Sequence, residues 1–179
     1  FYYLIGALAR LHQALVRFGI DYMIKKGYTY METPLMIHSD VVSGVMSFKE
    51  MENMMYKIEG EDLYLIGTSE HSLIGFYKNK TLGLKQLPQK LTSYSACFRK
   101  EVGSHGINEK GLFRTHQFNK VEMVVICKPE DSYKFYDEML KISSDIYKQL
   151  GIPTRVLECC SGDLADRKAK SCDLEFWSP

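Results

Sequence analysis

The sequence predicts an α+β fold: a mostly antiparallel β-sheet flanked by helices. Strand candidates outnumber the helices that could connect parallel strands. Two long strand candidates, 91–102 and 112–127, are joined by a glycine-bearing loop, which is typical of an antiparallel hairpin. With 179 residues, 45% of them hydrophobic and 12% aromatic, the chain can bury one sizeable core, and we expect a single domain.

The first third of the chain predicts a helix, a strand and an irregular stretch. Apolar residues recur at helical spacing from Leu4 to Tyr22, and Gly27 is a natural end for that helix. The β-prone run 28–33 meets Pro34, which cannot donate to a ladder and therefore belongs at a strand end or an edge. Residues 41–62 show no clear periodicity, so we expect loops and short irregular pieces there.

The remaining elements are also predicted by local pattern. The short apolar strand 63–66 precedes residues 68–70, where a threonine or a serine can cap the helix that follows. After the hairpin, the spacing of apolar residues predicts a helix over 129–150. Two further strands are expected at 156–159 and 172–177.

Composition narrows the class of protein. The 23 basic and 22 acidic residues nearly cancel, so any contact with nucleic acid has to be local. Five cysteines without C-x-x-C spacing indicate a reduced, intracellular protein. No apolar run approaches the roughly 20 residues that cross a bilayer, so we expect no membrane association. The chain begins at Phe1 rather than at Met, and we expect it to be a piece of a longer protein.

Charged residues gather on one face of the predicted hairpin. Strand alternation places Arg99 and Glu101 on the same side of the first strand. One face of the second strand carries Arg114, His116, Phe118, Lys120 and Glu122. Arginines can bind phosphates, an aromatic ring can stack on a base, and carboxylates can accept hydrogen bonds from amino groups. The alternative is a solvated sheet face with cross-strand ion pairs, which is common in antiparallel sheets.

Two stretches of the hairpin carry a family resemblance. Residues 98–101 (F-R-K-E) and 111–122 (G-L-F-R-T-H-Q-F-N-K-V-E) resemble the second signature motif of class II aminoacyl-tRNA synthetases, and most closely its seryl branch. Residues 26–35 resemble the first motif of this family, which builds a homodimer interface around its proline, here Pro34. The resemblance extends through 68–70, a T-x-E element, and covers nearly the whole chain.

The resemblance implies a role in ATP binding for five residues. Arg99, the expected catalytic residue, would hold the α-phosphate and the serine carboxylate, and Glu101 would accept from the adenine amino group. Phe118 would stack on adenine. Arg114 and Thr115 would lie beside the nucleotide, with Arg114 on the terminal phosphate.

The resemblance also implies a serine site and an activity. Thr68, Ser69 and Glu70 would surround the amino acid together with Glu122 and Arg99. The implied reaction is ATP-dependent activation of serine to seryl-adenylate, followed by transfer to tRNA(Ser) in the cytoplasm. Mg²⁺ is expected with the polyphosphate, with its ligands outside this chain. We expect residues 1–179 to be part of the catalytic domain, without the N-terminal tRNA-binding helical arm and without the third motif.

Two other functions remain open at this point. A ligase of the same fold could pass the activated amino acid to a carrier protein instead of tRNA. A non-catalytic relative could keep the scaffold for binding alone, although a scaffold has no need of the charged face. Residues 165–168 depart from the small apolar residues that are common at that place in the family, which leaves the local contacts there open.

Overall fold

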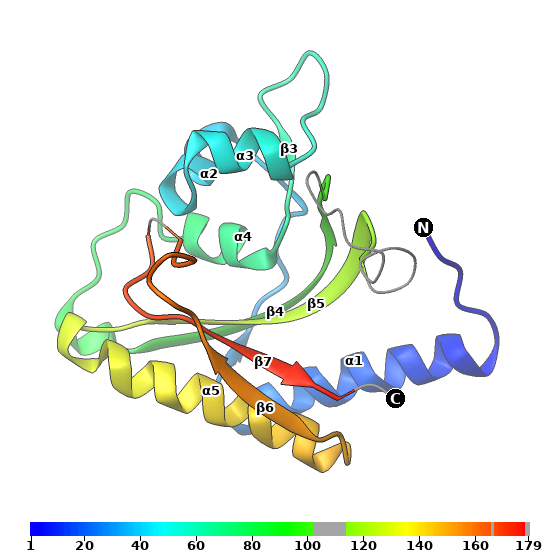
Figure 1. Ribbon diagram of the computed structural model, residues 1–179. Coiled ribbons are helices and arrows are strands. Elements are labelled where there is room, and N and C mark those ends of the chain that lie inside the picture. The colour runs from blue at the N-terminus through cyan, green and yellow to red at the C-terminus, as the bar shows by residue number, and fades with distance from the viewer. Residues whose placement is uncertain (102–113, 166, 178–179) are drawn as a thin grey trace.

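The structure is a computed structural model that describes residues 1–101, 114–165 and 167–177, with the side chain of Phe48 excepted (Figure 1). The helices are α1 (Ala7–Lys25), α2 (Ser39–Val45), α3 (Phe48–Met54), α4 (Ser69–Gly75) and α5 (Ser132–Gln149), with 3₁₀ turns at Leu84–Gln86 and Pro129–Asp131. The strands are β1 (Thr29–Tyr30), β2 (Met36–Ile37), β3 (Tyr64–Leu65), β4 (Gln89–Phe98), β5 (Gln117–Ile126), β6 (Thr154–Glu158) and β7 (Cys172–Phe176).

The central sheet has the strand order β1-β4-β5. β1 runs parallel to β4, whereas β4 and β5 form an antiparallel pair in register from Gln89 opposite Ile126 to Phe98 opposite Gln117. The pairs β2-β3 and β6-β7 are small antiparallel sheets of their own. The predicted α+β class with a mostly antiparallel sheet is therefore confirmed.

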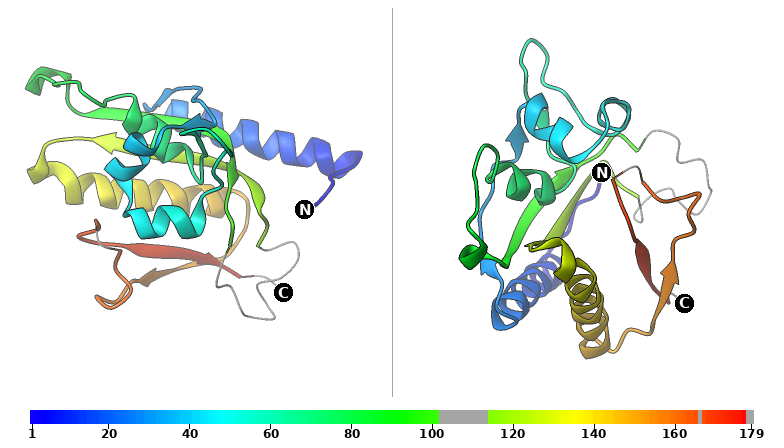
Figure 2. Two further views of the ribbon diagram at one scale, coloured as in Figure 1. Left: turned by 90° about the horizontal axis from the view of Figure 1, so that it is seen from above. Right: turned by 90° about the vertical axis from the view of Figure 1, so that its left-hand side faces the viewer.

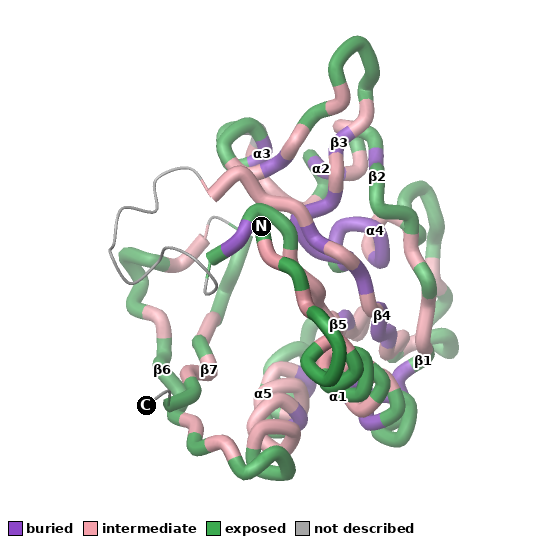
Figure 3. The backbone as a smooth tube through the Cα atoms, turned by 90° about the vertical axis from the view of Figure 1, so that its right-hand side faces the viewer, coloured by how far each residue is buried: buried purple, intermediate pink, exposed green. Residues whose placement is uncertain are grey.

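Helices cover both faces of the central sheet. α1 and α5 lie side by side on one face (Figure 2), where Phe18 and Ile142 pack in one cluster with Val121 and Met123 of β5. α4 covers part of the other face, and its Leu73 packs against Leu91 and Val124. Burial is accordingly concentrated along β4 and α4 (Figure 3).

The face beneath α4 changes character along β5. Val124 and Ile126 belong to the apolar cluster around Leu73. Phe118, Lys120 and Glu122 continue the same face, because residues two apart in a strand point the same way. One half of this face is therefore core, and the polar half beyond α4 is available for a ligand site.

The interpretation of residues 41–62 as irregular is wrong, because α2 and α3 occupy most of them. α3 begins with a capping box, in which the Ser47 hydroxyl accepts from the Glu50 amide at 3.3 Å and the Ser47 amide donates to the Glu50 carboxylate at 2.8 Å. Each helix has seven residues, too few to show a helical period. Met51 and Met55 are almost completely buried, so tertiary packing holds this region.

The hairpin strands are shorter than predicted. β4 ends at Phe98, and β5 begins at Gln117. The Arg99 amide still donates to the His116 carbonyl at 2.9 Å, but Glu101 has a φ of 51° and leaves the extended conformation. Strand alternation thus holds for Phe118 to Glu122 and does not extend to Glu101 or Arg114. The rest of the predicted strand ends, 102 and 112–113, lies outside the described residues.

The first helix differs from its prediction at its start. α1 begins at Ala7 rather than Leu4, and Gly27 follows its end with a φ of 84°, as expected for a glycine stop. Three residues of the predicted apolar stripe, Leu8, Leu11 and Leu15, are 56%, 64% and 47% exposed.

Among the helices of the described residues, none is long and apolar enough to cross a membrane.

Candidate active site

A cavity of about 500 Å³ lies where the β4-β5 hairpin leaves the sheet. Its lining residues are Tyr2, Leu4, Arg99, Glu101, Arg114, Thr115 and Phe118. The structure therefore brings together all of the residues that the sequence predicted for the nucleotide. Tyr2 and Leu4 were missed, since nothing in the local sequence links the start of the chain to the hairpin.

Arg99 connects this cavity to the neighbouring α4. Its Nε donates to the carbonyl of Gly67 at 3.1 Å, and its Cζ lies 5.1 Å from the centroid of the Phe118 ring. A Cβ on Gly67 would approach Cγ of Arg99 to 3.7 Å and Cε of Met54 to 3.2 Å. Glycine at 67 therefore leaves room for the Met54 side chain, whereas the distance to Arg99 would be an ordinary van der Waals contact.

Glu101 and Arg114 form an ion pair across the mouth of the hairpin. Arg114 Nη1 lies 2.6 Å from Glu101 Oε2. The Glu101 side chain is only 16% exposed and the Arg114 side chain 44%, so the carboxylate is the more enclosed partner. The left-handed backbone of Glu101 is uncommon for a residue with a Cβ, and such conformations concentrate at functional sites.

The residues that the sequence predicted to bind the amino-acid substrate lie together beside the start of α4. The Thr68 hydroxyl donates to Glu122 Oε2 at 2.6 Å, and Lys120 Nζ lies 2.5 Å from the same oxygen. Thr68 also caps α4, because its Oγ1 accepts from the Glu70 amide at 3.2 Å. One side chain thus fixes the start of the helix and the position of the carboxylate on β5.

Two carboxylates, Glu70 and Glu122, lie close enough here for their charges to interact. Glu70 is exposed as a residue, yet partial burial of its carboxyl raises its pKa, and the negative charge of Glu122 adds to the shift. The positive charges of Lys120 and Arg99 act in the opposite direction. A cationic ligand group would relieve the repulsion between the two acids, so an ammonium group suits this place.

Ser69 and His71 lie beneath the site rather than on its wall. Ser69 is completely buried and His71 is 3% exposed. The Ser69 hydroxyl and His71 Nδ1 have no hydrogen-bond partner among the described residues. Burial, together with the positive charges of Lys120 and Arg99, lowers the pKa of His71 to about 4. His71 is therefore a neutral ring at physiological pH.

The other predicted residues lie apart from the cavity. Pro34 is exposed, and its carbonyl accepts from the Ser72 hydroxyl at 2.8 Å. His116 does not line the cavity; its Nδ1 lies 2.6 Å from the Tyr56 hydroxyl. Within the described part of the chain, no three metal-ligating side chains gather. The carboxylate that lines the cavity, Glu101, is paired with Arg114, and the Mg²⁺ ligands stay a prediction for residues outside this chain.

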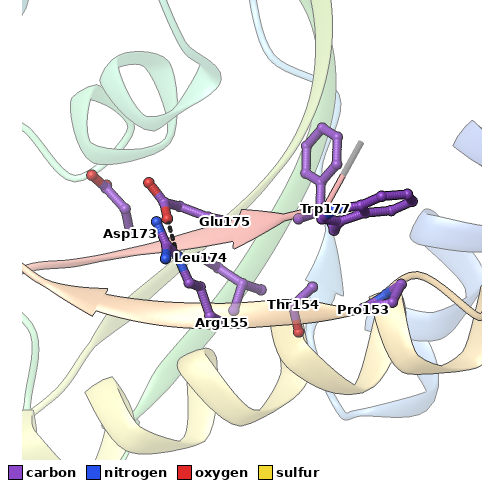
Figure 4. Close-up of a pocket in the computed structure, with 8 residues that line it drawn as sticks. Pro153, Thr154, Arg155, Asp173, Leu174, Glu175 and Trp177 are labelled. Atoms are coloured by element: carbon purple, nitrogen blue, oxygen red, sulfur yellow. Dashed lines mark hydrogen bonds and ion pairs between the residues drawn. The ribbon is translucent and has the colours of Figure 1, made fainter. Parts of the chain in front are cut away.

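A larger cavity lies elsewhere, on the β6-β7 hairpin. It has a volume of about 940 Å³ and is lined by residues from Pro153 to Arg155 and from Asp173 to Trp177 (Figure 4). Its main polar contact joins Arg155 Nε to Glu175 Oε2 at 2.6 Å. The Arg155 side chain is 78% exposed, and this ion pair offers no enclosed group for binding or chemistry.

Comparison with known proteins shows the family to which this chain belongs. The sequence model described as "tRNA synthetase class II core domain (G, H, P, S and T)" matches residues 53–179. The chain belongs to this class II synthetase family. The charged hairpin residues, from Arg99 to Glu122, lie within the matched part of the chain.

Curated relatives of this class II core span its whole length. The serine–tRNA ligase of Picrophilus torridus is 45% identical over 179 residues, and that of Methanocella arvoryzae is 44% identical over the same stretch. Each alignment covers 100% of this chain but 40% and 42% of the respective relative. The chain therefore spans about 40% of the length of these relatives.

Solved structures give the same result for the class II fold. The seryl-tRNA synthetase from Pyrococcus horikoshii complexed with ATP has a TM-score of 0.95 at 43% identity, covering 99% of this chain and 40% of that one. The cytoplasmic serine–tRNA ligase from Naegleria fowleri in complex with AMP has a TM-score of 0.92 at 41% identity, covering 98% and 42%.

Proposed function

We propose that this chain is the nucleotide- and serine-binding part of the catalytic domain of a serine–tRNA ligase. Relatives of that name match it over its full length, and two solved neighbours of that name are complexes with ATP or AMP. One observation carries the proposal: Arg99 lines the cavity with Phe118 and donates to Gly67, the residue before Thr68. A nucleotide in the cavity and an amino acid beside Thr68 would therefore both reach the guanidinium group of Arg99.

The nucleotide half has partners for each part of ATP. A cavity of about 500 Å³ is within the range that suits a small ligand. Arg99 and Arg114 would hold the α-phosphate and the terminal phosphate, with Thr115 beside the nucleotide. Phe118 would stack on adenine and Glu101 would accept from its amino group. Since Arg99 now lies over Phe118 and Arg114 pairs with Glu101, the phosphates would draw both guanidinium groups away and release the two base-binding groups.

The serine half would select the substrate by its polar groups. Glu70 and Glu122 can accept from the ammonium and the hydroxyl, while Thr68 orients Glu122 and Ser69 supports the helix start from below. Alanine in this place would leave an acceptor without its hydroxyl partner. Unpaired buried polar groups give strong discrimination against a substrate that lacks the matching group.

The first chemical step needs no proton transfer. The serine carboxylate is already an anion, so one of its oxygens can attack the α-phosphorus and form the seryl-adenylate as pyrophosphate leaves. Arg99, between the two substrates, would balance the charge that develops on the α-phosphate. Holding both reactants in line supplies much of the remaining acceleration. Mg²⁺ stays a prediction tied to the polyphosphate, and no step above depends on it.

The partners belong to the whole protein that carries this chain. We propose tRNA(Ser) as the acceptor, the cytoplasm as the location and a homodimer through the first motif. The surface around Pro34 supports the dimer, since Leu35 and Met36 beside it are 40% and 48% exposed. α1 offers a further exposed apolar surface, the stripe of Leu8, Leu11 and Leu15.

The test is serine-dependent exchange of pyrophosphate into ATP by the intact protein. We expect exchange with serine and little with threonine, alanine or glycine. Charging of tRNA(Ser), with no transfer to carrier proteins, would separate a synthetase from a carrier-protein ligase. ATP binding without exchange for any amino acid would favour a non-catalytic scaffold and contradict the proposal.

A further inference from the structure

The segment before α1 presents alternate side chains to the protein. Phe1, Tyr3 and Ile5 are 92%, 91% and 81% exposed, whereas Tyr2 and Leu4 are half-buried. An extended chain points successive side chains in opposite directions. Residues 1–5 therefore have an outer and an inner side, and Tyr2 and Leu4 form the inner one.

The inner side lies near the start of β5. β5 is an edge strand of the described sheet. Tyr2 and Leu4 line the nucleotide cavity together with Phe118, and they also line a cavity of about 340 Å³ together with Gln117 and Asn119. Phe118 points to the opposite face from its two neighbours, and Arg114 and Thr115 just before β5 line the same cavity. The segment therefore lies at the start of β5, where both faces of the strand are within reach. Tyr2 and Leu4 thus form an outer wall of the nucleotide cavity.

The ends of this segment fix its course. Gly6 has a φ of 61° and a ψ of −124°, a conformation that residues with a Cβ rarely adopt, and α1 begins at the next residue. At the other end, the Phe1 ring stacks near His116, with centroids 6.0 Å apart. His116 in turn forms a hydrogen bond with the Tyr56 hydroxyl. The turn at Gly6 therefore directs the backbone of residues 1–5 away from the axis of α1 (Figure 1).

We propose that Tyr2 and Leu4 are further positioning residues of the nucleotide site and contact the base and ribose of ATP. The inference rests on the proposed function. The cations of the cavity, Arg99 and Arg114, suit the phosphates, whereas Tyr2 and Leu4 offer an aromatic and an aliphatic surface. Such surfaces match the flat, weakly polar nucleoside. Together with Phe118, they would enclose it between the hairpin and the start of the chain.

The experiment compares neighbouring residues that differ in the side they face. Tyr2→Ala and its control Tyr3→Ala remove the same side chain from adjacent positions. Dissociation constants for ATP and AMP are measured on the intact protein by calorimetry, with melting temperature as a check on folding. Arg114→Ala serves as the phosphate reference, because we expect it to weaken ATP more than AMP.

We expect Tyr2→Ala to weaken ATP and AMP equally, by about tenfold, which is the size of one lost contact between a base and an aromatic ring. Tyr3→Ala should stay within about twofold of the unmodified protein, as should Tyr2→Phe, which keeps the ring. Leu4→Ala should resemble Tyr2→Ala in direction, with Ile5→Ala as its control.

Two results would overturn the inference while leaving the proposed function intact. One is ATP binding by Tyr2→Ala that equals that of Tyr3→Ala. The other is a loss for ATP alone, which would place Tyr2 at the phosphates. Failure of the unmodified protein to bind ATP would instead overturn the proposed function, and this inference with it.

Discussion

At the scale of single residues, the site depends on groups that serve two neighbours at once. Thr68 caps α4 and binds Glu122, and Lys120 shares the same carboxylate oxygen. Burial raises the pKa of Glu70, and the negative charge of the nearby Glu122 raises it further. Each group is therefore held before any ligand arrives, which is the condition for electrostatic stabilisation without reorganisation.

His71 should make stability depend on pH. Its folded pKa of about 4 lies below its usual value of 6.5, so the unfolded chain binds the proton more readily. The stabilising contribution is complete above pH 6.5 and is lost as the pH falls towards 4, at up to about 1.4 kcal/mol per pH unit. Urea unfolding between pH 7 and pH 4 measures this slope.

The matched variants are His71→Gln and His38→Gln. His38 is an exposed histidine, with 65% of its side chain in contact with solvent. We expect the slope to flatten in His71→Gln and to persist in His38→Gln. Equal slopes for the unmodified chain and His71→Gln would show that the histidine titrates freely in the folded state.

At the scale of elements, the site lies between a hairpin end and a helix start. β4 and β5 hold Phe118 and Glu122 in a rigid register, and α4 ends over the apolar half of the same face. Arg99 and Glu101 follow β4 directly, so they are positioned by the strand without being part of it. Loops anchored to a rigid scaffold in this way are common at binding sites.

Thr68→Val should affect α4 and the serine site together. Valine keeps the shape of threonine but cannot cap the helix or donate to Glu122. We expect a loss of about 1–2 kcal/mol in the free energy of unfolding and a rise in the KM for serine without a matching rise in the KM for ATP. Thr68→Ser, which keeps the hydroxyl, should restore both. Unchanged stability in Thr68→Val would contradict the assigned cap.

Local sequence predicted the elements whose signals are local. Gly27 ends α1, Thr68 caps α4, and the alternation through Phe118 and Glu122 gives the face of β5. The short helices α2 and α3 were not predicted. Tertiary packing of Met51 and Met55 stabilises this region, and neither a helical repeat of apolar residues nor helix propensity indicates it. The left-handed conformation of Glu101 could be seen only in the structure, because nothing in the sequence indicates a positive φ at a glutamate.

The cavity as a whole was only partly predictable. Strand alternation grouped Arg99, Glu101, Arg114 and Phe118, and the family resemblance added Thr115 and the role of each residue. Tyr2 and Leu4 are about a hundred residues away in sequence and meet the hairpin only through the path of α1 and the turn at Gly6. A contact of such long range leaves no periodic pattern in a single sequence.

At the scale of the whole molecule, the two faces of the central sheet differ: one packs against helices, and part of the other carries the proposed site. α1 and α5 close one face with an apolar cluster, and the other face divides into core under α4 and an open polar half. The exposed stripe of Leu8, Leu11 and Leu15 lies on α1, on the supporting side. A partner subunit could therefore cover that stripe without blocking the cavity, which is consistent with the proposed homodimer.

The account depends most on Arg99 as the link between the two substrates. The direct measurement is serine-dependent pyrophosphate exchange by the intact protein carrying Arg99→Ala, beside Arg155→Ala, which removes an exposed arginine from the β6-β7 hairpin. We expect exchange to fall by about a thousandfold in Arg99→Ala, with an unchanged melting temperature, and to remain normal in Arg155→Ala. Exchange by Arg99→Ala within tenfold of the unmodified protein would contradict the account.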